Sequence, residues 1–235
     1  MASGSKPYTS RGLHVYDYLV HNFSNKYIWR CPTDSVLIPW FAANAGPRHM
    51  DIGVGTGFFP STHREREAMV NRNWPEKLML VDLNPMCLET AARRVGAPDR
   101  TTCQQADVMQ PITLRPSASG HEQQPEPMVF DSISLMYVIH CLPPPTKDKA
   151  RLFANVKPYL TPEGTLFGAT VLGKGVQHNW LGRLQMWNMN RLEFFGNLDD
   201  GKEELVEALA ANFHEVETTV VGVVLLFRAK KPKFT

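Results

Sequence analysis

The sequence predicts an α/β fold: a Rossmann-like, doubly wound, mostly parallel seven-stranded sheet that ends in an antiparallel hairpin and is preceded by N-terminal helices. Two observations carry this prediction. Short apolar runs alternate with helix-length segments, which is typical of parallel strands joined by crossover helices. The last two apolar runs are separated only by Val221-Gly222, a link too short for a crossover, so we expect these strands to pair antiparallel.

The elements follow in order along the chain. Helical stretches are expected first, at 13–25 and 34–44. The expected strands are 48–52, 78–83, 101–106, 130–137, 165–172, 215–220 and 223–229, and the helices between them 63–71, 86–95 and 146–160. The stretch 110–127 is rich in Pro, Ser, Gln and Glu and lacks periodicity, so we expect a surface insertion there.

A length of 235 residues fits one α/β domain. Within it we expect a helical cap over 1–46 and a catalytic core over 47–235, with 174–198 as a candidate substrate lid. A formal net charge of +2 is too small for the electrostatic footprint of a nucleic-acid-binding protein. The longest apolar run, 220–227, is far shorter than the ~20 residues that cross a bilayer. A small-molecule substrate is therefore expected, without a nucleic-acid or membrane partner.

Composition also bears on the compartment. The first ten residues contain no apolar stretch of the kind found in signal peptides. The four cysteines, at 31, 87, 103 and 141, form no CxxC pair and have no histidine at ligand spacing. We expect a cytoplasmic protein with reduced thiols and no bound metal, and the sequence does not indicate an oligomeric state.

A glycine-rich loop, Asp51-Ile52-Gly53-Val54-Gly55-Thr56-Gly57, directly follows the first expected strand. Glycines permit a tight turn and a close approach of a ligand to the backbone, and the N–H groups at a helix start favour a negatively charged group. Asp51, Gly53, Gly55, Thr56 and Gly57 are thus candidate cofactor-binding residues. Such a loop taken alone also occurs as a simple connection between elements.

Acidic residues follow the next two strands. Asp82 ends the second strand, where a carboxylate can accept hydrogen bonds from both hydroxyls of a ribose. The alternative is a helix cap, but Asn84 already supplies one. Asp107 ends the third strand and can accept from an adenine amino group, with Val108 offering its backbone N–H. A dinucleotide fingerprint would require a third glycine at Phe58, which disfavours an NAD-dependent oxidoreductase.

Taken in order, these motifs resemble those of class I S-adenosylmethionine-dependent methyltransferases. After the glycine loop the series continues with 80–82, 106–108, 130–133 and 162–165, and the resemblance spans 48–229. It implies S-adenosylmethionine as cofactor, lying across the carboxyl ends of the strands. It further implies Gly53, Gly55 and Gly57 near the methionine moiety, Asp82 at the ribose, and Asp107 with Val108 at the adenine. The remaining expected cofactor residues are Leu83, Met136 and Tyr137.

A narrower likeness concerns 22–32, 137–143 and 167–174, which are similar to small methyltransferases encoded with fungal polyketide pathways, some of the α-pyrone O-methylating type. This likeness implies methyl transfer to a hydroxyl oxygen of a secondary metabolite such as a polyketide. An alternative stays open, because a protein of this fold that binds S-adenosylmethionine without transferring methyl, as a rearrangement catalyst or binding module, would keep the same cofactor residues.

Two histidines are candidate general bases. His140 follows the fourth strand and His178 the fifth, so both are expected at the carboxyl edge of the sheet, where a neutral imidazole can take a hydroxyl proton. For each, a hydrogen bond to a neighbouring loop is an equally valid interpretation.

Aromatic residues are the candidates for substrate contacts. Trp180 and Trp187 lie in the apolar stretch 179–195, where a lid is expected, and Tyr16 and Trp29 lie in the aromatic N-terminal stretch. Broad aromatic side chains suit a planar substrate. Packing in the core is the rival interpretation for all four.

Overall fold

A computed structural model of the chain describes residues 18–114 and 128–234. Seven strands form one sheet in the order β3-β2-β1-β4-β5-β7-β6. Their bounds are β1 Arg48–Ile52, β2 Lys77–Asp82, β3 Thr101–Gln105, β4 Phe130–Met136, β5 Leu160–Val171, β6 Phe213–Val221 and β7 Val224–Pro232. The first five strands run parallel, and β7 pairs antiparallel with both β5 and β6. The predicted fold class is therefore confirmed.

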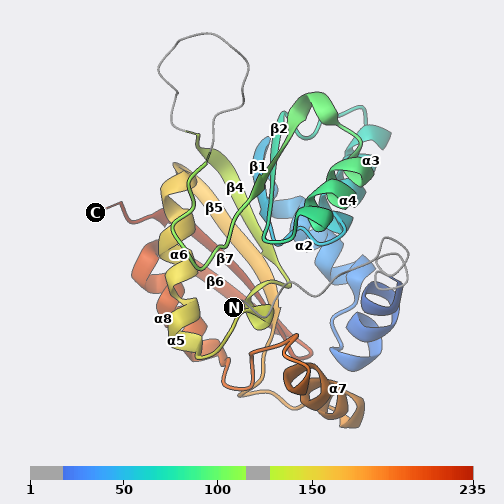
Figure 1. Ribbon diagram of the computed structural model, residues 1–235, viewed down its shortest axis with the longest axis vertical. Coiled ribbons are helices and arrows are strands. Elements are labelled where there is room, and N and C mark those ends of the chain that lie inside the picture. Colours follow the sequence, from blue (N-terminus) through green and yellow to red (C-terminus); the bar gives the residue numbers. More distant parts are fainter. Residues whose placement is uncertain (1–17, 115–127, 235) are drawn as a thin grey trace.

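Helices cover both faces of this sheet (Figure 1). On one face lie α2 (Ile38–Asn44), α3 (Phe58–Met69) and α4 (Pro85–Val95), and on the other α5 (Thr146–Lys149), α6 (Arg151–Val156) and α8 (Lys202–Asn212). Helix α7 (Trp180–Arg191) lies beyond one end of the sheet and packs against the N-terminal helix η1 (Tyr18–Ile28). Short helical turns are η2 (Thr33–Leu37), η3 (Pro98–Arg100), η4 (Ile139–Cys141) and η5 (Lys157–Tyr159).

The alternation of side chains along the buried strands explains the two layers. In β2, Leu78 and Leu80 pack with α2, α3 and α4, whereas Met79 and Val81 pack with α6 and α8. All four side chains are at most 2% exposed. Successive strand residues point to opposite faces, so a continuously apolar strand needs helices on both sides.

Several element boundaries differ from the predicted ones. Helix α3 begins at residue 58, directly behind the glycine loop, rather than at 63. Strand β5 begins at residue 160 rather than at 165, so Pro162 and Gly164 lie within a strand. The single helix predicted over 146–160 is divided into α5, α6 and the turn η5, where Pro158 lacks an amide N–H to continue the helix. Helix α8 is not predicted at all.

Two predicted segments lie partly outside the described residues: the start of the first helix, 13–17, and most of the insertion, 115–127. Within the described part of the chain, no helix combines the length and the apolar character that a membrane span needs.

Candidate active site

The strand order reverses direction between β1 and β4. Strands β2 and β3 follow outward from β1 on one side, and β5 follows outward from β4 on the other side. In open α/β sheets, ligands bind in the crevice beyond the carboxyl ends of the strands at such a point. Two cavities lie there, of about 240 Å³ and 170 Å³. We call them the loop cavity and the aromatic cavity. Their shared wall consists of Gly53, Gly55, Thr56 and Tyr137.

The glycine loop is shaped by steric requirements. Gly53 has a φ of 69°, and a Cβ there would lie 2.5 Å from Cγ2 of Val138. Gly57 has a φ of 71°, and a Cβ there would lie 2.8 Å from Cα of Ala91 in α4. Gly57 lines neither cavity, so its observed role is to let the start of α3 approach α4. Space remains open around Gly55, where an added Cβ would meet no atom within 4 Å.

Asp82 stands at the end of β2 with its carboxylate beside the loop cavity. The carboxylate accepts hydrogen bonds from the backbone N–H of Gly55 at 3.2 Å and of Asn84 at 2.8 Å. Burial raises the pKa of Asp82 above its usual range, and these two hydrogen bonds oppose the rise. The cap of α4 is Asn84, whose side chain accepts from the N–H of Met86. The carboxylate of Asp82 is therefore not used as the helix cap.

The remaining wall of the loop cavity comes from the ends of β3 and β4. Asp107 accepts a hydrogen bond from the N–H of Met109 at 2.9 Å, and the carbonyl of Val108 accepts from the side chain of Asn155 at 3.0 Å. The structure thus brings together around one cavity the predicted residues Gly53, Gly55, Thr56, Asp82, Leu83, Asp107, Val108 and Tyr137. Sequence reasoning missed other lining residues, Asn84, Cys87, Ala106, Val138, Cys141 and Leu142, although each lies within six residues of a strand end.

The aromatic cavity lies on the other side of the loop. Its lining includes the predicted Asp51, Met136, Trp29 and His140, together with Phe58, Phe59, Gln185, Met189 and Phe195, which the sequence analysis did not assign to a site. Trp29 is buried, with 3% of its surface exposed. Tyr16 lies outside the described residues.

His140 sits in the turn η4, just after β4. Its Nδ1 accepts the backbone N–H of Val171 at 3.3 Å and lies 3.3 Å from the hydroxyl of Thr170. Its ring meets Phe195 edge-on, with the two ring centres 4.4 Å apart. Burial lowers the pKa of His140 to about 3, so the ring is neutral at physiological pH.

Three further predicted site residues, His178, Trp180 and Trp187, do not line the aromatic cavity. Nε2 of His178 donates a hydrogen bond to the carbonyl oxygen of Leu172 at 2.8 Å, because a carbonyl oxygen can only accept. His178 lines a separate open cavity together with Trp187. Trp180 and Trp187 are 66% and 57% exposed. Helix α7 faces the aromatic cavity with Gln185 and Met189, which are four residues apart and thus share a face that excludes both tryptophans.

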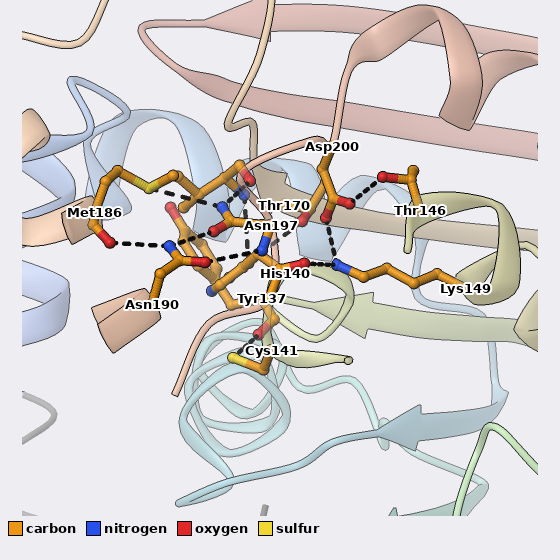
Figure 2. Close-up of polar contacts among 12 residues, drawn as sticks. Tyr137, His140, Cys141, Thr146, Lys149, Thr170, Met186, Asn190, Asn197 and Asp200 are labelled. Atoms are coloured by element: carbon orange, nitrogen blue, oxygen red, sulfur yellow. Dashed lines mark hydrogen bonds and ion pairs between the residues drawn. The ribbon is translucent and has the colours of Figure 1, made fainter. Parts of the chain in front are cut away.

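A buried polar network fixes the segment that follows α7 (Figure 2). The ammonium of Lys149 lies 2.6 Å from the Asp200 carboxylate and donates to the carbonyl of Gly196 at 2.8 Å. Thr146 donates to the same carboxylate at 2.7 Å, and the N–H of Gly196 donates to the carbonyl of His140 at 2.9 Å. Lys149 and Asp200 are fully buried. No sequence signal distinguished Lys149 from an ordinary surface lysine on a helix.

Among the described residues, no group of His, Cys, Asp and Glu side chains is arranged to hold a metal ion.

Comparison with known proteins bears on this arrangement. A family model described as a methyltransferase domain matches residues 32–212. The chain is 50% identical to methyltransferase verB of Penicillium polonicum over 99% of this chain and 100% of that protein. It is 40% identical to the physcion biosynthesis cluster O-methyltransferase of Aspergillus chevalieri over 94% and 91% of the two chains, and 36% identical to N-methyltransferase vrtF of Penicillium aethiopicum over 87% and 78%.

A solved structure shares the fold. N-methyltransferase NodS of Bradyrhizobium japonicum, in complex with S-adenosyl-L-homocysteine, aligns with a TM-score of 0.59 over 95% of this chain and 98% of its own, at 14% sequence identity. The family model spans most of the chain, and three relatives exceed a third in identity. The chain therefore belongs to the methyltransferase family that uses S-adenosylmethionine as its methyl donor.

Proposed function

We propose that this protein transfers the methyl group of S-adenosylmethionine to a hydroxyl oxygen of a small planar acceptor, such as a polyketide. The observation that carries the proposal is the wall shared by the two cavities. One cavity presents the half-buried carboxylates of Asp82 and Asp107, the other presents aromatic and thioether side chains, and the two cavities meet at the glycine loop. The 40% identical O-methyltransferase relative supports oxygen as the acceptor atom, whereas the N-methyltransferase relative makes nitrogen the competing outcome of the test.

The loop cavity fits the cofactor. Asp82 offers a half-buried carboxylate that would accept from the ribose hydroxyls, with Leu83 beside it, and Asp107 with Val108 would hold the adenine. The open space at Gly55 admits a ligand against the backbone. The methionine portion would then lie at the shared wall, near Gly53 and Tyr137. Asp51, Thr56 and Met136 would also line the part of the site that holds the methionine portion. Gly57 would support this part indirectly, through the packing of α3 against α4. When bound, S-adenosylmethionine supplies an electrophilic methyl group on a sulfonium.

The aromatic cavity would hold the acceptor. Trp29, Phe59 and Phe195 offer flat apolar surfaces for a planar ring. In the reaction, the acceptor oxygen forms a bond to the methyl carbon, the carbon–sulfur bond breaks, and the acceptor proton passes to water. Alignment of these atoms supplies much of the catalysis.

His140 acts in this proposal as a hydrogen-bond donor. Because its Nδ1 accepts the N–H of Val171, the neutral ring carries its proton on Nε2 and can donate to an acceptor oxygen. That arrangement favours holding the acceptor over removing its proton, and an acidic enol or phenol ionises unaided. His178 packs edge-on against Trp29, with the ring centres 6.1 Å apart, and lines a separate cavity, so it would take part only after a rearrangement of this wall.

The lid assignment is part of the same proposal. We assign 174–198, which contains α7, as the substrate lid, the helices within 1–46 as the cap beside it, and 47–235 as the catalytic core. Contact between α7 and η1, and the position of Gln185 and Met189 in the cavity wall, support this division.

The test uses the purified full chain, S-adenosylmethionine and a panel of phenols, enolic 1,3-dicarbonyl compounds and arylamines. Release of S-adenosylhomocysteine and mass spectrometry of the products are the readouts. We expect O-methylated products from the phenols or enols. Products only from the amines would move the proposal to nitrogen. Cofactor binding without turnover on any acceptor would favour the alternative of a binding protein or rearrangement catalyst.

A further inference from the structure

A chain of buried polar side chains runs under the active site between β1 and β4. His49 and Asp51 are two residues apart on β1, so they share one face of the sheet, and Ser132 and Ser134 share the same face of β4. The strand register pairs His49 with Ser132 and Asp51 with Ser134. All four side chains are at most 4% exposed.

Hydrogen bonds connect these side chains in series. The N–H of Gly46 donates to the hydroxyl of Ser132 at 2.7 Å, and that hydroxyl lies 2.7 Å from Nδ1 of His49. Nε2 of His49 lies 3.0 Å from the hydroxyl of Ser134, which donates to the carboxylate of Asp51. The series therefore begins at a backbone group that can only donate and ends at a carboxylate in the wall of the aromatic cavity.

The direction of the series follows from counting protons. If Ser134 gives its only hydroxyl proton to Asp51, it must accept from Nε2–H of His49. A neutral imidazole then has a lone pair on Nδ1, which accepts the hydroxyl proton of Ser132. The reverse direction would place the proton of His49 on Nδ1, facing a Ser132 oxygen that already accepts from Gly46, and would leave the buried Ser132 proton without an acceptor.

We infer that His49 is a positioning residue of the cofactor site: it closes a one-directional series of hydrogen bonds that holds the Asp51 carboxylate ionised and oriented at the meeting point of the two cavities. The inference rests on the proposed function, in which Asp51 lies at the methionine portion of the bound cofactor, whose ammonium group is cationic. His49 itself touches neither cavity.

The surroundings of the series explain why it is needed. Burial raises the pKa of Asp51 to about 7, with Asp82 on β2 adding repulsion, while the hydrogen bond from Ser134 opposes the rise. His140 of η4 shares the aromatic cavity with Asp51.

The surroundings of His49 keep its ring uncharged. His63 of α3 lies close enough to disfavour a charge on His49. His49 is further enclosed by Phe41 and Phe167, whose ring centres lie 5.3 Å and 5.8 Å from its own, and burial lowers its pKa to about 3. It therefore stays neutral with a fixed tautomer.

The experiment measures S-adenosylhomocysteine affinity by titration calorimetry from pH 5.5 to 8.5, for the full chain and for two variants. Ser134→Ala cuts the series next to Asp51. Met50→Ala is the matched control, because Met50 is equally buried in β1 but points to the opposite face. We expect Ser134→Ala to bind ~10-fold more weakly at pH 6, as for the loss of a hydrogen bond to a charged group, and the midpoint of its pH dependence to move to higher pH. The control should keep the wild-type affinity and midpoint. An unchanged midpoint in Ser134→Ala would overturn the inference.

A second measurement needs no variant. In the ¹⁵N NMR spectrum of the wild-type imidazoles, His49 should show the neutral Nε2–H tautomer without titrating between pH 5.5 and 8.5. An Nδ1–H tautomer, or a titration in this range, would also overturn the inference even where S-adenosylhomocysteine binds. Failure of the wild-type chain to bind S-adenosylhomocysteine would instead overturn the proposed function, and the NMR spectrum would still decide the direction of the series.

Discussion

The two halves of the carboxyl edge are built in different ways. The loop cavity is lined by short segments that immediately follow β1, β2, β3 and β4, so each functional group lies within a few residues of the strand that positions it. The aromatic cavity combines η1, the glycine loop, η4, α7 and the segment after α7, which come from distant parts of the chain. Groups held by local backbone geometry leave a pattern in the sequence, whereas groups held by long-range contacts leave almost none.

The largest effect is expected at the buried ion pair of Lys149 and Asp200, which joins two distant parts of the chain. Lys149→Met leaves the Asp200 carboxylate buried without its counter-charge, so we expect a loss of about 3–5 kcal/mol in the free energy of unfolding. Thermal denaturation measures it, and for a chain of this size each kcal/mol corresponds to roughly 2–4 °C in Tm. Lys147→Met, on the exposed side of α5, is the matched control and should change the stability by less than about 0.5 kcal/mol. Equal melting temperatures for both variants would show that Asp200 is not held by Lys149.

In the cofactor half, Asp82→Ala should separate binding from folding. The ribose hydroxyls would lose a charged acceptor, which corresponds to about 1.5–3 kcal/mol, or roughly 10- to 150-fold in affinity for S-adenosylhomocysteine. Calorimetry measures the affinity, and far-ultraviolet circular dichroism checks the fold. Asp99→Ala, at an exposed position on η3, serves as the control with unchanged affinity. Wild-type affinity in Asp82→Ala would mean that the ribose lies elsewhere.

His140 tests whether the acceptor half supplies a base. With its pKa lowered to about 3 by burial, the ring is uncharged from pH 5 to 9, so its titration adds no acid limb to kcat/KM in that range. We expect the acid limb to follow the pKa of the acceptor when acceptors of different acidity are compared. His140→Gln, which keeps an N–H donor, should lose no more than ~10-fold in rate, whereas removal of a general base costs ~10²–10⁴-fold. An acid limb of kcat/KM at the same pH for every acceptor would instead indicate that an enzyme group acts as the general base.

The smallest effects are expected on the outer face of α7. Trp180→Ala removes a side chain that is 66% exposed, so the stability should change by less than about 0.5 kcal/mol, and KM for the acceptor should stay the same. Trp29→Ala, at a residue that is 3% exposed and lines the aromatic cavity, is the contrasting variant, with an expected cost of about 3–5 kcal/mol. Unfolding in urea and acceptor saturation curves measure both. A raised KM in Trp180→Ala alone would place the acceptor on the outer face.

Residues Asp51 to Thr56, Asp82, Asp107 and Val108 could be assigned to the walls of the two cavities from their order along the chain. Each follows a strand whose apolar run is visible in the sequence, and parallel strands bring their carboxyl ends to one edge. The antiparallel ending was predictable for a similar reason, because the two residues at 221 and 222 leave no room for a crossover. In these places the covalent chain itself limits where the groups can go.

The tertiary structure alone decided what long-range contacts control. Two tryptophans of α7 point outward and Gln185 and Met189 inward, and an apolar helix sequence does not show which face meets its neighbour until that neighbour is in place. The same holds for Lys149, an ordinary helix lysine by its sequence, which is buried only because Asp200 arrives from 51 residues away. His49 and His140 likewise acquire their hydrogen-bond partners from β4 and β5. Burial and hydrogen-bond partners determine the chemistry of a polar side chain, and both depend on residues that are distant in sequence.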